Sequence, residues 1–97
     1  MDADRLAALF PEDDDQFLKF DLISEADRLH PSRRLCGLLK IAELMREPES
    51  FGFSSEHDVV YLANADDLRE ITPDEAVYLS RCGVHYEDDV ECLAMFC

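Results

Sequence analysis

The residues of this chain that best suit chemistry are three cysteines and one histidine near its C-terminus. They follow the spacing C-x2-H-x6-C-x4-C and are Cys82, His85, Cys92 and Cys97. Thiolates and imidazoles are the ligands of structural zinc sites, so this set allows a small zinc centre. Such sites usually show two closely spaced pairs of ligands, and free cysteine is among the most buried residue types. We therefore expect buried, reduced cysteines and neither a metal nor another cofactor, and a small zinc protein remains an alternative.

A second candidate for chemistry is His57, which lies between Glu56 and Asp58. Neighbouring carboxylates favour the protonated imidazole, so the triplet has the composition of an acid and base pair. In an extended strand, however, adjacent side chains point to opposite faces, and a general base also needs a pocket and a positioned substrate. The chain contains no G-x-S-x-G motif, no phosphate-binding loop and no dinucleotide-binding fingerprint. The sequence therefore predicts a protein that is not an enzyme.

The clearest functional signal is an excess of negative charge. The chain has 23 Asp and Glu residues against 9 Lys and Arg residues, for a formal net charge of -14 over 97 residues. Four of the basic residues form an island between two acidic segments: Arg33, Arg34, Lys40 and Arg46. We expect this basic island to form internal ion pairs, and the alternative is a docking patch for a phosphate or an acidic partner. Because the surrounding charge repels phosphates, direct binding of DNA or RNA is not expected.

Many of the carboxylates lie in short runs, of which the first is at residues 12–15. None of these runs has the alternating oxygen ligands and central glycine of an EF-hand loop. Such runs commonly serve solubility, but together they also present a negative surface that attracts a basic protein and competes with nucleic acid for it. We therefore predict a non-enzymatic acidic binding protein that docks on a positively charged, nucleic-acid-binding protein, as inhibitors and nucleic-acid mimics do. The residues expected to bind this partner are Asp66, Asp67, Glu70, Asp74, Glu75, Glu87, Asp88, Asp89 and Phe96.

Three helices are predicted in the first half of the chain. Residues 3–10 have leucine and phenylalanine at helical spacing between an aspartate cap and a proline stop. Apolar residues also recur at helical spacing over residues 16–29, which favours a helix there over a strand. Residues 32–47 carry one broad apolar face and form the best predicted core helix. The following residues, 49–55, are expected to form a loop.

The second half of the chain begins with a predicted strand and helix. Residues 58–63 are rich in β-branched and aromatic side chains and predict a strand buried on both faces. A capping box follows, in which Thr72 caps a helix and Glu75 reaches back to the cap. A proline occupies the first helical position, where its missing N–H costs nothing. The helix is expected over residues 73–82, and Gly83 ends it in the left-handed conformation.

The last residues predict a β-hairpin with strands 84–87 and 91–96 and two aspartates at its tip. In the expected register, His85 lies opposite Cys92. The face of the hairpin that includes His85 also carries Cys92, Ala94 and Phe96. This face is too apolar for water, so we expect the N-terminal helices or a partner chain to cover it.

Together these elements predict an α+β fold in which N-terminal helices pack on a small, mostly antiparallel three-stranded sheet, with one connecting helix. The length fits a single small acidic domain over residues 1–97. No apolar run is long enough to cross a membrane and the first residues do not resemble a secretory signal, so a cytoplasmic location without membrane partners is expected. The alternative function is an interaction or assembly module, including a homo-oligomer, that uses the apolar face of the C-terminal hairpin.

Overall fold

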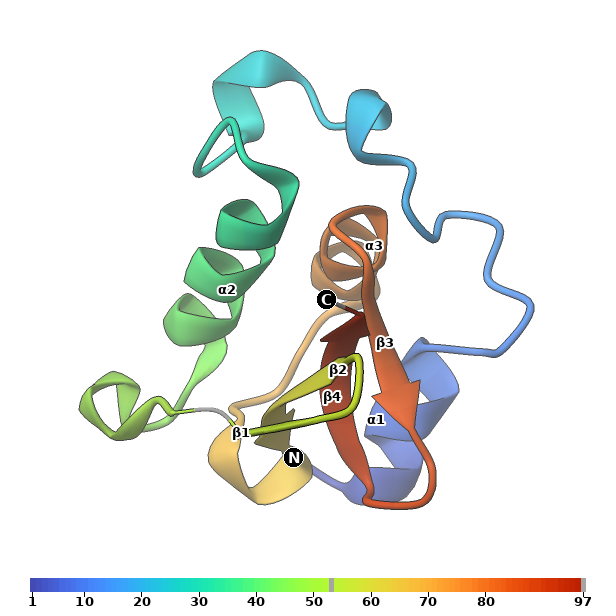
Figure 1. Ribbon diagram of the computed structural model, residues 1–97, viewed down its shortest axis with the longest axis vertical. Helices are drawn as coiled ribbons and strands as arrows, with labels where there is room; N and C mark the ends of the chain where they lie inside the picture. The colour runs from blue at the N-terminus through green and yellow to red at the C-terminus, as the bar shows by residue number, and fades with distance from the viewer. Residues whose placement is uncertain (53, 97) are drawn as a thin grey trace.

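The computed structural model describes residues 1–52 and 54–96, which form three α-helices and one antiparallel sheet (Figure 1). The helices are α1 (Ala3–Leu9), α2 (Arg33–Leu44) and α3 (Pro73–Arg81). The strands are β1 (Ser54–Glu56), β2 (Val59–Asn64), β3 (Val84–Glu87) and β4 (Cys92–Phe96), in the order β1-β2-β4-β3. Short 3-10 helices are η1 (Phe20–Leu22), η2 (Glu25–Asp27), η3 (Pro48–Ser50) and η4 (Ala65–Asp67). The predicted α+β class is confirmed. No helix among the described residues has the length and hydropathy to cross a membrane.

The boundaries of α3 follow from local chemistry that the sequence displays. The Thr72 hydroxyl accepts a hydrogen bond from the backbone N–H of Glu75 at 3.2 Å, and the Glu75 carboxylate accepts one from the Thr72 N–H at 3.0 Å. This reciprocal pair satisfies donors that the first turn of a helix leaves free. At the other end, Gly83 adopts a φ of 95°, which only glycine reaches without strain. The capping box and the glycine stop are both confirmed.

The helix predicted over residues 16–29 is wrong, because the structure has turns and the short helices η1 and η2 there. Leu18 adopts a left-handed φ of 65° and donates its N–H to the carbonyl of Ser80 at 3.0 Å, which interrupts any continuous helix. The segment buries Ile23, which is 4% exposed, whereas Leu22 is 54% exposed. Contacts with α2 and α3 therefore decide which side chains of this segment are buried, and these are not the ones on the predicted helical stripe. Tertiary packing overrides the local pattern.

The sheet has four strands, so the prediction of three was wrong. The additional strand is β1, which lies in the segment expected to be a loop and pairs antiparallel with β2. Every residue of β1 is exposed. An exposed edge strand of this kind has no alternating apolar side chains by which the sequence could reveal it. It is a strand because its backbone pairs with that of β2.

The β3–β4 hairpin is confirmed, but its register differs from the prediction. His85 lies opposite Ala94 instead of Cys92, a shift of two residues. The turn is correspondingly longer and uses Glu91 with a left-handed φ of 51°. A shift of two keeps every side chain on its predicted face, because side chains alternate with a period of two. His85, Ala94 and Phe96 therefore share a face as expected.

The core lies between the helices and the other face of the sheet. Its fully buried leucines include Leu6 of α1, Leu44 of α2, Leu79 of α3 and Leu93 of β4. Helix α2 packs against α3 and β2, and α3 also packs against β3. In Figure 1, α2 lies to the left of the sheet, α1 to its lower right and α3 above it. A smaller buried cluster attaches Ile23 to the same two helices, α2 and α3.

The face of the sheet that carries His85 stays partly open. Tyr61 and His85 flank Ala94 on this face. The loop after α1 brings Phe17 to the β3 side, where its ring centroid lies 6.0 Å from that of His85. Phe96 remains 53% exposed. The end of α1 and the loop after it therefore cover part of this face, through Phe10 and Phe17 among others.

Candidate functional site

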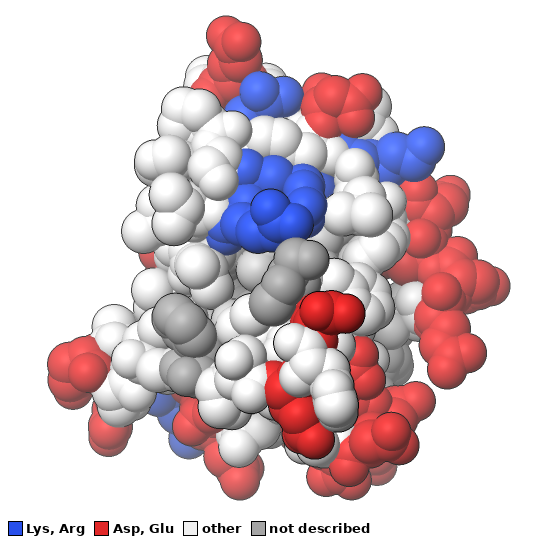
Figure 2. All heavy atoms as spheres, in the orientation of Figure 1, with Lys and Arg blue, Asp and Glu red and all other residues white. Residues whose placement is uncertain are grey.

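Carboxylates from three separate segments gather at one end of the molecule, which we call the acidic end. Its residues are Asp2, Asp4, Asp66, Glu87, Asp88, Asp89 and Glu91. Asp2, Asp66 and Glu91 line one shallow hollow. Burial and then the charges of Glu91, Asp88 and Asp4 raise the pKa of Tyr86 above its ordinary value. The start of α1, helix η4 and the β3–β4 turn therefore create one region of negative potential, and Figure 2 shows carboxylates along the lower and right-hand edges of this view.

Basic side chains do not neutralise the acidic end. The ion pairs of Lys or Arg with carboxylates among the described residues are Arg5–Glu70 at 3.3 Å, Lys40–Glu43 at 3.4 Å and Arg69–Glu75 at 3.5 Å. From the basic island, Arg33 and Arg46 donate to the backbone carbonyls of Cys82 and Leu68. In Figure 2 the basic side chains near the middle of the view are separate from the acidic lower edge. The island therefore stabilises the fold mainly through backbone contacts, and the acidic end keeps its charge.

The residues predicted to bind a partner divide into two groups. The acidic end includes Asp66, Glu87, Asp88 and Asp89, of which Glu87 also contacts His85. Asp67, Glu70 and Glu75 lie outside the acidic end and have partners within the fold. Asp67 accepts a hydrogen bond from the Asn64 N–H at 3.2 Å and completes a capping box at η4. Although burial raises the pKa of Glu75, its hydrogen bonds with Thr72 and the charge of Arg69 outweigh burial and hold that pKa below the ordinary value. Asp74 lies in the first turn of α3 and lines another hollow, and Phe96 lines the pocket described below.

The described members of the candidate zinc set are not brought together. Cys82 is fully buried beside Cys36, and burial raises the pKa of its thiol. His85 Nε2 lies 2.7 Å from a carboxylate oxygen of Glu87. In the sheet, Cys92 is paired with Glu87 and not with His85. Within residues 1–52 and 54–96, no group of three or more His, Cys, Asp or Glu side chains is placed to hold a metal ion. Cys97 lies outside the described residues.

Of the triplet around His57, Glu56 ends β1, and His57 and Asp58 form the exposed turn between β1 and β2. The side chain of His57 is 89% exposed and its Nε2 lies 4.0 Å from the Glu56 carboxylate. His57 also has a left-handed φ of 57°. A fully hydrated turn offers no enclosed place for a substrate, so the geometry gives the triplet no catalytic setting.

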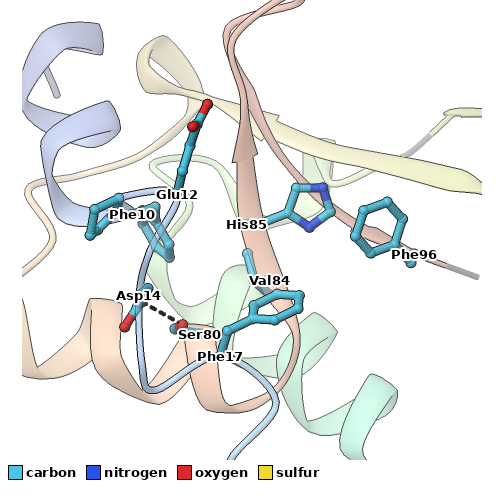
Figure 3. Close-up of a pocket in the computed structure, with 9 residues that line it drawn as sticks. Phe10, Glu12, Asp14, Phe17, Ser80, Val84, His85 and Phe96 are labelled. Atoms are coloured by element: carbon cyan, nitrogen blue, oxygen red, sulfur yellow. Dashed lines mark hydrogen bonds between the residues drawn. The ribbon is translucent and has the colours of Figure 1, made fainter.

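A pocket of about 260 Å³ lies where the loop after α1 crosses α3 and the edge of the sheet (Figure 3). Five of its nine lining residues are apolar and four are polar or charged. Its lining residues are Phe10, Pro11, Glu12, Asp14, Phe17, Ser80, Val84, His85 and Phe96. The pocket thus combines residues from both ends of the sequence, with aromatic rings next to carboxylates.

His85 is the polar centre of this pocket. Its ring stacks on Phe96 with centroids 4.4 Å apart and an interplanar angle of 21°, and Phe17 meets it edge-on at 78°. Figure 3 shows the imidazole between these two phenyl rings. His85 Nδ1 is buried and has no hydrogen-bond partner among the described residues. A buried nitrogen of this kind costs free energy unless a partner satisfies it.

Hydrogen bonds hold the pocket loop against α3. Asp14 accepts from the Ser80 hydroxyl at 2.6 Å and from the backbone N–H of Gln16 at 2.9 Å. The side-chain oxygen of Gln16 in turn accepts from Arg81 Nε at 2.9 Å. Figure 3 marks the contact between Asp14 and Ser80. These contacts give the Asp14 carboxylate a fixed place at the pocket.

Sequence reasoning found only part of this pocket. It placed His85 and Phe96 on one sheet face, but it assigned Phe17 to a helix and read Asp14 as part of an acidic run. The hydrogen bond that decides the geometry joins residues 14 and 80, which are 66 positions apart. No local pattern in the sequence indicates a contact of that separation.

Comparison of the chain with protein-family models, with curated proteins and with solved structures finds no match. The acidic end and the aromatic pocket are therefore the basis on which a function is inferred.

Proposed function

We propose that this chain is a non-enzymatic acidic binding protein that docks on a positively charged, nucleic-acid-binding protein, as an inhibitor or nucleic-acid mimic does. The observation that carries the proposal is the acidic end. It collects carboxylates from α1, η4 and the β3–β4 turn, and none of them pairs with a Lys or Arg among the described residues. Docking on a basic surface would neutralise charges that otherwise repel one another.

The proposed docking acts through electrostatics. A negative surface on a small protein attracts a basic partner over several ångströms and raises the association rate. The same basic groove would otherwise hold phosphates, so the docked protein and nucleic acid exclude each other. Asp66, Asp88 and Asp89 are exposed and make no side-chain hydrogen bond or ion pair within the described residues, so they are free to meet lysine and arginine side chains.

The test is the salt dependence of binding to an identified partner. Proteins captured from the native host by the tagged chain are identified, purified and titrated at low and high ionic strength. We expect the affinity to fall steeply with salt, because exposed charges are screened beyond about 8 Å at physiological ionic strength. Added DNA should displace the chain from the same partner. An affinity that does not change with salt or with DNA would contradict the proposal.

The open sheet face supports a second candidate function, assembly through the C-terminal hairpin. Phe96 and Val90 are each at least half exposed, and a second copy of the chain would remove them from water. Sedimentation equilibrium of the wild type and of Phe96→Ser distinguishes the two functions. A dimer that Phe96→Ser dissociates supports assembly, whereas a monomer at every concentration removes it.

The proposal also places the protein in the cytoplasm, where nucleic-acid-binding partners are available. Cys36, Cys82 and Cys92 are free, which agrees with a reducing compartment. Fractionation of host cells with an antibody against the chain tests this location.

A further inference from the structure

The side chains that line the aromatic pocket favour one kind of ligand, and the acidic end does not account for this. We propose that this pocket receives an arginine side chain of the basic protein partner, an inference that rests on the proposed function. The pocket lies under the loop that carries the acidic run 12–15, so a cationic group drawn to that loop meets the pocket mouth (Figure 3). The size, the walls and the polar groups of the pocket each favour this occupant.

The size of the pocket fits one side chain. Its volume of about 260 Å³ is below the roughly 300–1,000 Å³ of typical small-molecule sites. Phe10, Phe17 and Phe96 supply three aromatic rings around this space. Aromatic faces attract cations through their quadrupoles, and the planar guanidinium group also stacks on them, which an ammonium group does not. The walls therefore favour arginine over lysine.

The polar groups of the pocket are acceptors. Glu12 is exposed at the rim and has no ion pair among the described residues. Asp14 accepts two hydrogen bonds, and a carboxylate has about four acceptor positions. The lining also includes the hydroxyl of Ser80, which already donates its proton to Asp14. A guanidinium group carries five donors and no acceptor, so its hydrogen-bonding capacity complements this lining.

His85 contributes its ring to the pocket wall, and Glu87 holds this ring in place. The Glu87 carboxylate lies 2.7 Å from Nε2, and an ionised carboxylate only accepts, so we assign the ring proton to Nε2. Nδ1 is then an acceptor, and it is the buried nitrogen that lacks a partner among the described residues. Because Nδ1 is closed to water, an arginine in the pocket packs against the imidazole ring and does not bond to this nitrogen. The residues that line the pocket include neither lysine nor arginine, so no fixed charge opposes the ligand.

The test uses a short blocked peptide with one arginine among glycines and serines, titrated into the isotope-labelled protein and followed by NMR. We expect saturable shifts of the His85 and Phe17 ring signals. The same peptide with lysine should bind more weakly, and the peptide with citrulline, which lacks the charge, should not bind. Equal binding of the citrulline peptide, or shifts confined to exposed carboxylates, would overturn the inference.

Three variants locate the effect in the pocket. Glu12→Gln removes a charge at the rim of the pocket and should lower the affinity for the arginine peptide about threefold. Asp13→Asn is its matched control, because it removes a neighbouring exposed charge that does not line the pocket. Phe17→Leu keeps an apolar side chain but removes an aromatic face from the pocket wall, and it should weaken binding about threefold. An undiminished affinity of Phe17→Leu, with native amide dispersion in its spectrum, would contradict the role assigned to the aromatic wall.

The failure of this inference is distinguishable from a failure of the proposed function. If partner binding is steep in salt but His85 and Phe17 never shift, the acidic docking surface stands and the arginine pocket is removed. If the arginine peptide shifts both rings while partner binding is insensitive to salt, the pocket stands and the proposed function is removed.

Discussion

Single residues in this protein often combine a local structural role with the excess of charge. Glu75 contributes to the net charge, yet its carboxylate accepts the Thr72 N–H and pairs with Arg69. Gly83 contributes no side chain, but its positive φ lets the chain turn from α3 into β3. At this scale, the chemical type of a residue does not reveal whether it serves folding or binding.

The pH dependence of stability tests the role of Glu75. Its folded-state pKa is held below the ordinary value of 4.5, so its charged form contributes stability above that value and loses it as the pH falls through the lower folded-state pKa. Glu75→Gln should lower the free energy of unfolding by about 0.5–1 kcal/mol at neutral pH. Urea titrations should show that this difference disappears as the pH falls through the lowered pKa of the folded state. A difference that persists in acid would mean that the charge is not the cause.

The left-handed glycine provides a second test at the same scale. In Gly83→Ala, the new Cβ would collide with the Arg33 guanidinium, whose Nη1 donates to the Cys82 carbonyl. We expect a loss of about 1–3 kcal/mol in urea denaturation. Gly52→Ala is the control, because the nearest atom to its new Cβ is Ser50 O at 4.0 Å. Equal stabilities of the two variants would contradict the role of the Gly83 conformation.

At the scale of elements, the segment between α1 and α2 determines most of what is unusual in the fold. It has the apolar content of a helix but forms loops and short 3-10 helices held by contacts to α3. Tyr78 of α3 donates its hydroxyl proton to the Asp27 carbonyl at 2.8 Å, and Leu18 bonds to Ser80. This arrangement brings Phe17 and Asp14 to the pocket. A continuous helix would not allow both contacts.

Two neighbouring substitutions test which side chain anchors this segment. Ile23→Ala removes a side chain buried beside Cys36 and Cys82, and it should cost about 2–4 kcal/mol in unfolding free energy. Leu22→Ala changes a residue on the predicted helical stripe that is exposed in the structure, and its effect should stay within about 0.5 kcal/mol. Thermal and urea unfolding of both variants provide the comparison. The reverse order of effects would support the helix instead.

At the scale of the whole molecule, the excess charge becomes a surface. Asp2, Asp66 and Glu91 are distant in sequence and share one hollow. The chain is small, with a radius of gyration of 12.2 Å. Much of the acidic end therefore lies within about one or two screening lengths at physiological salt. A basic partner consequently meets these carboxylates together.

Charge reversal tests whether the position of the charges matters or only their number. Asp66→Lys, Asp88→Lys and Asp89→Lys change exposed residues of the acidic end that have no internal ion pair among the described residues. We expect this triple variant to fold normally and to bind the identified partner at least about tenfold more weakly.

The matched control for this reversal moves the same amount of charge elsewhere. The triple variant Asp21→Lys, Glu25→Lys and Glu49→Lys also changes exposed residues, none of which belongs to the acidic end or lines a hollow with Asp66. Stopped-flow association rates should fall much more for the first triple variant than for the second. Equal losses would show that net charge alone governs docking.

The helix ends and the hairpin faces could be predicted because their signals are local. Thr72, Glu75 and Gly83 act on backbone groups within one turn, and the period-two alternation survived a register shift of two residues. Strand β1 could not be predicted, because its exposed residues carry no pattern and pairing with β2 defines it.

By itself, the sequence determined the α+β composition, the caps, the faces of the C-terminal hairpin and the sign of the charge. Each of these depends on interactions between near neighbours or on a simple sum over residues. Only the tertiary structure decided which carboxylates gather at the acidic end and that His85 meets Phe17 beside Asp14. Contacts between residues tens of positions apart carry no local signature, because packing of the whole core selects them.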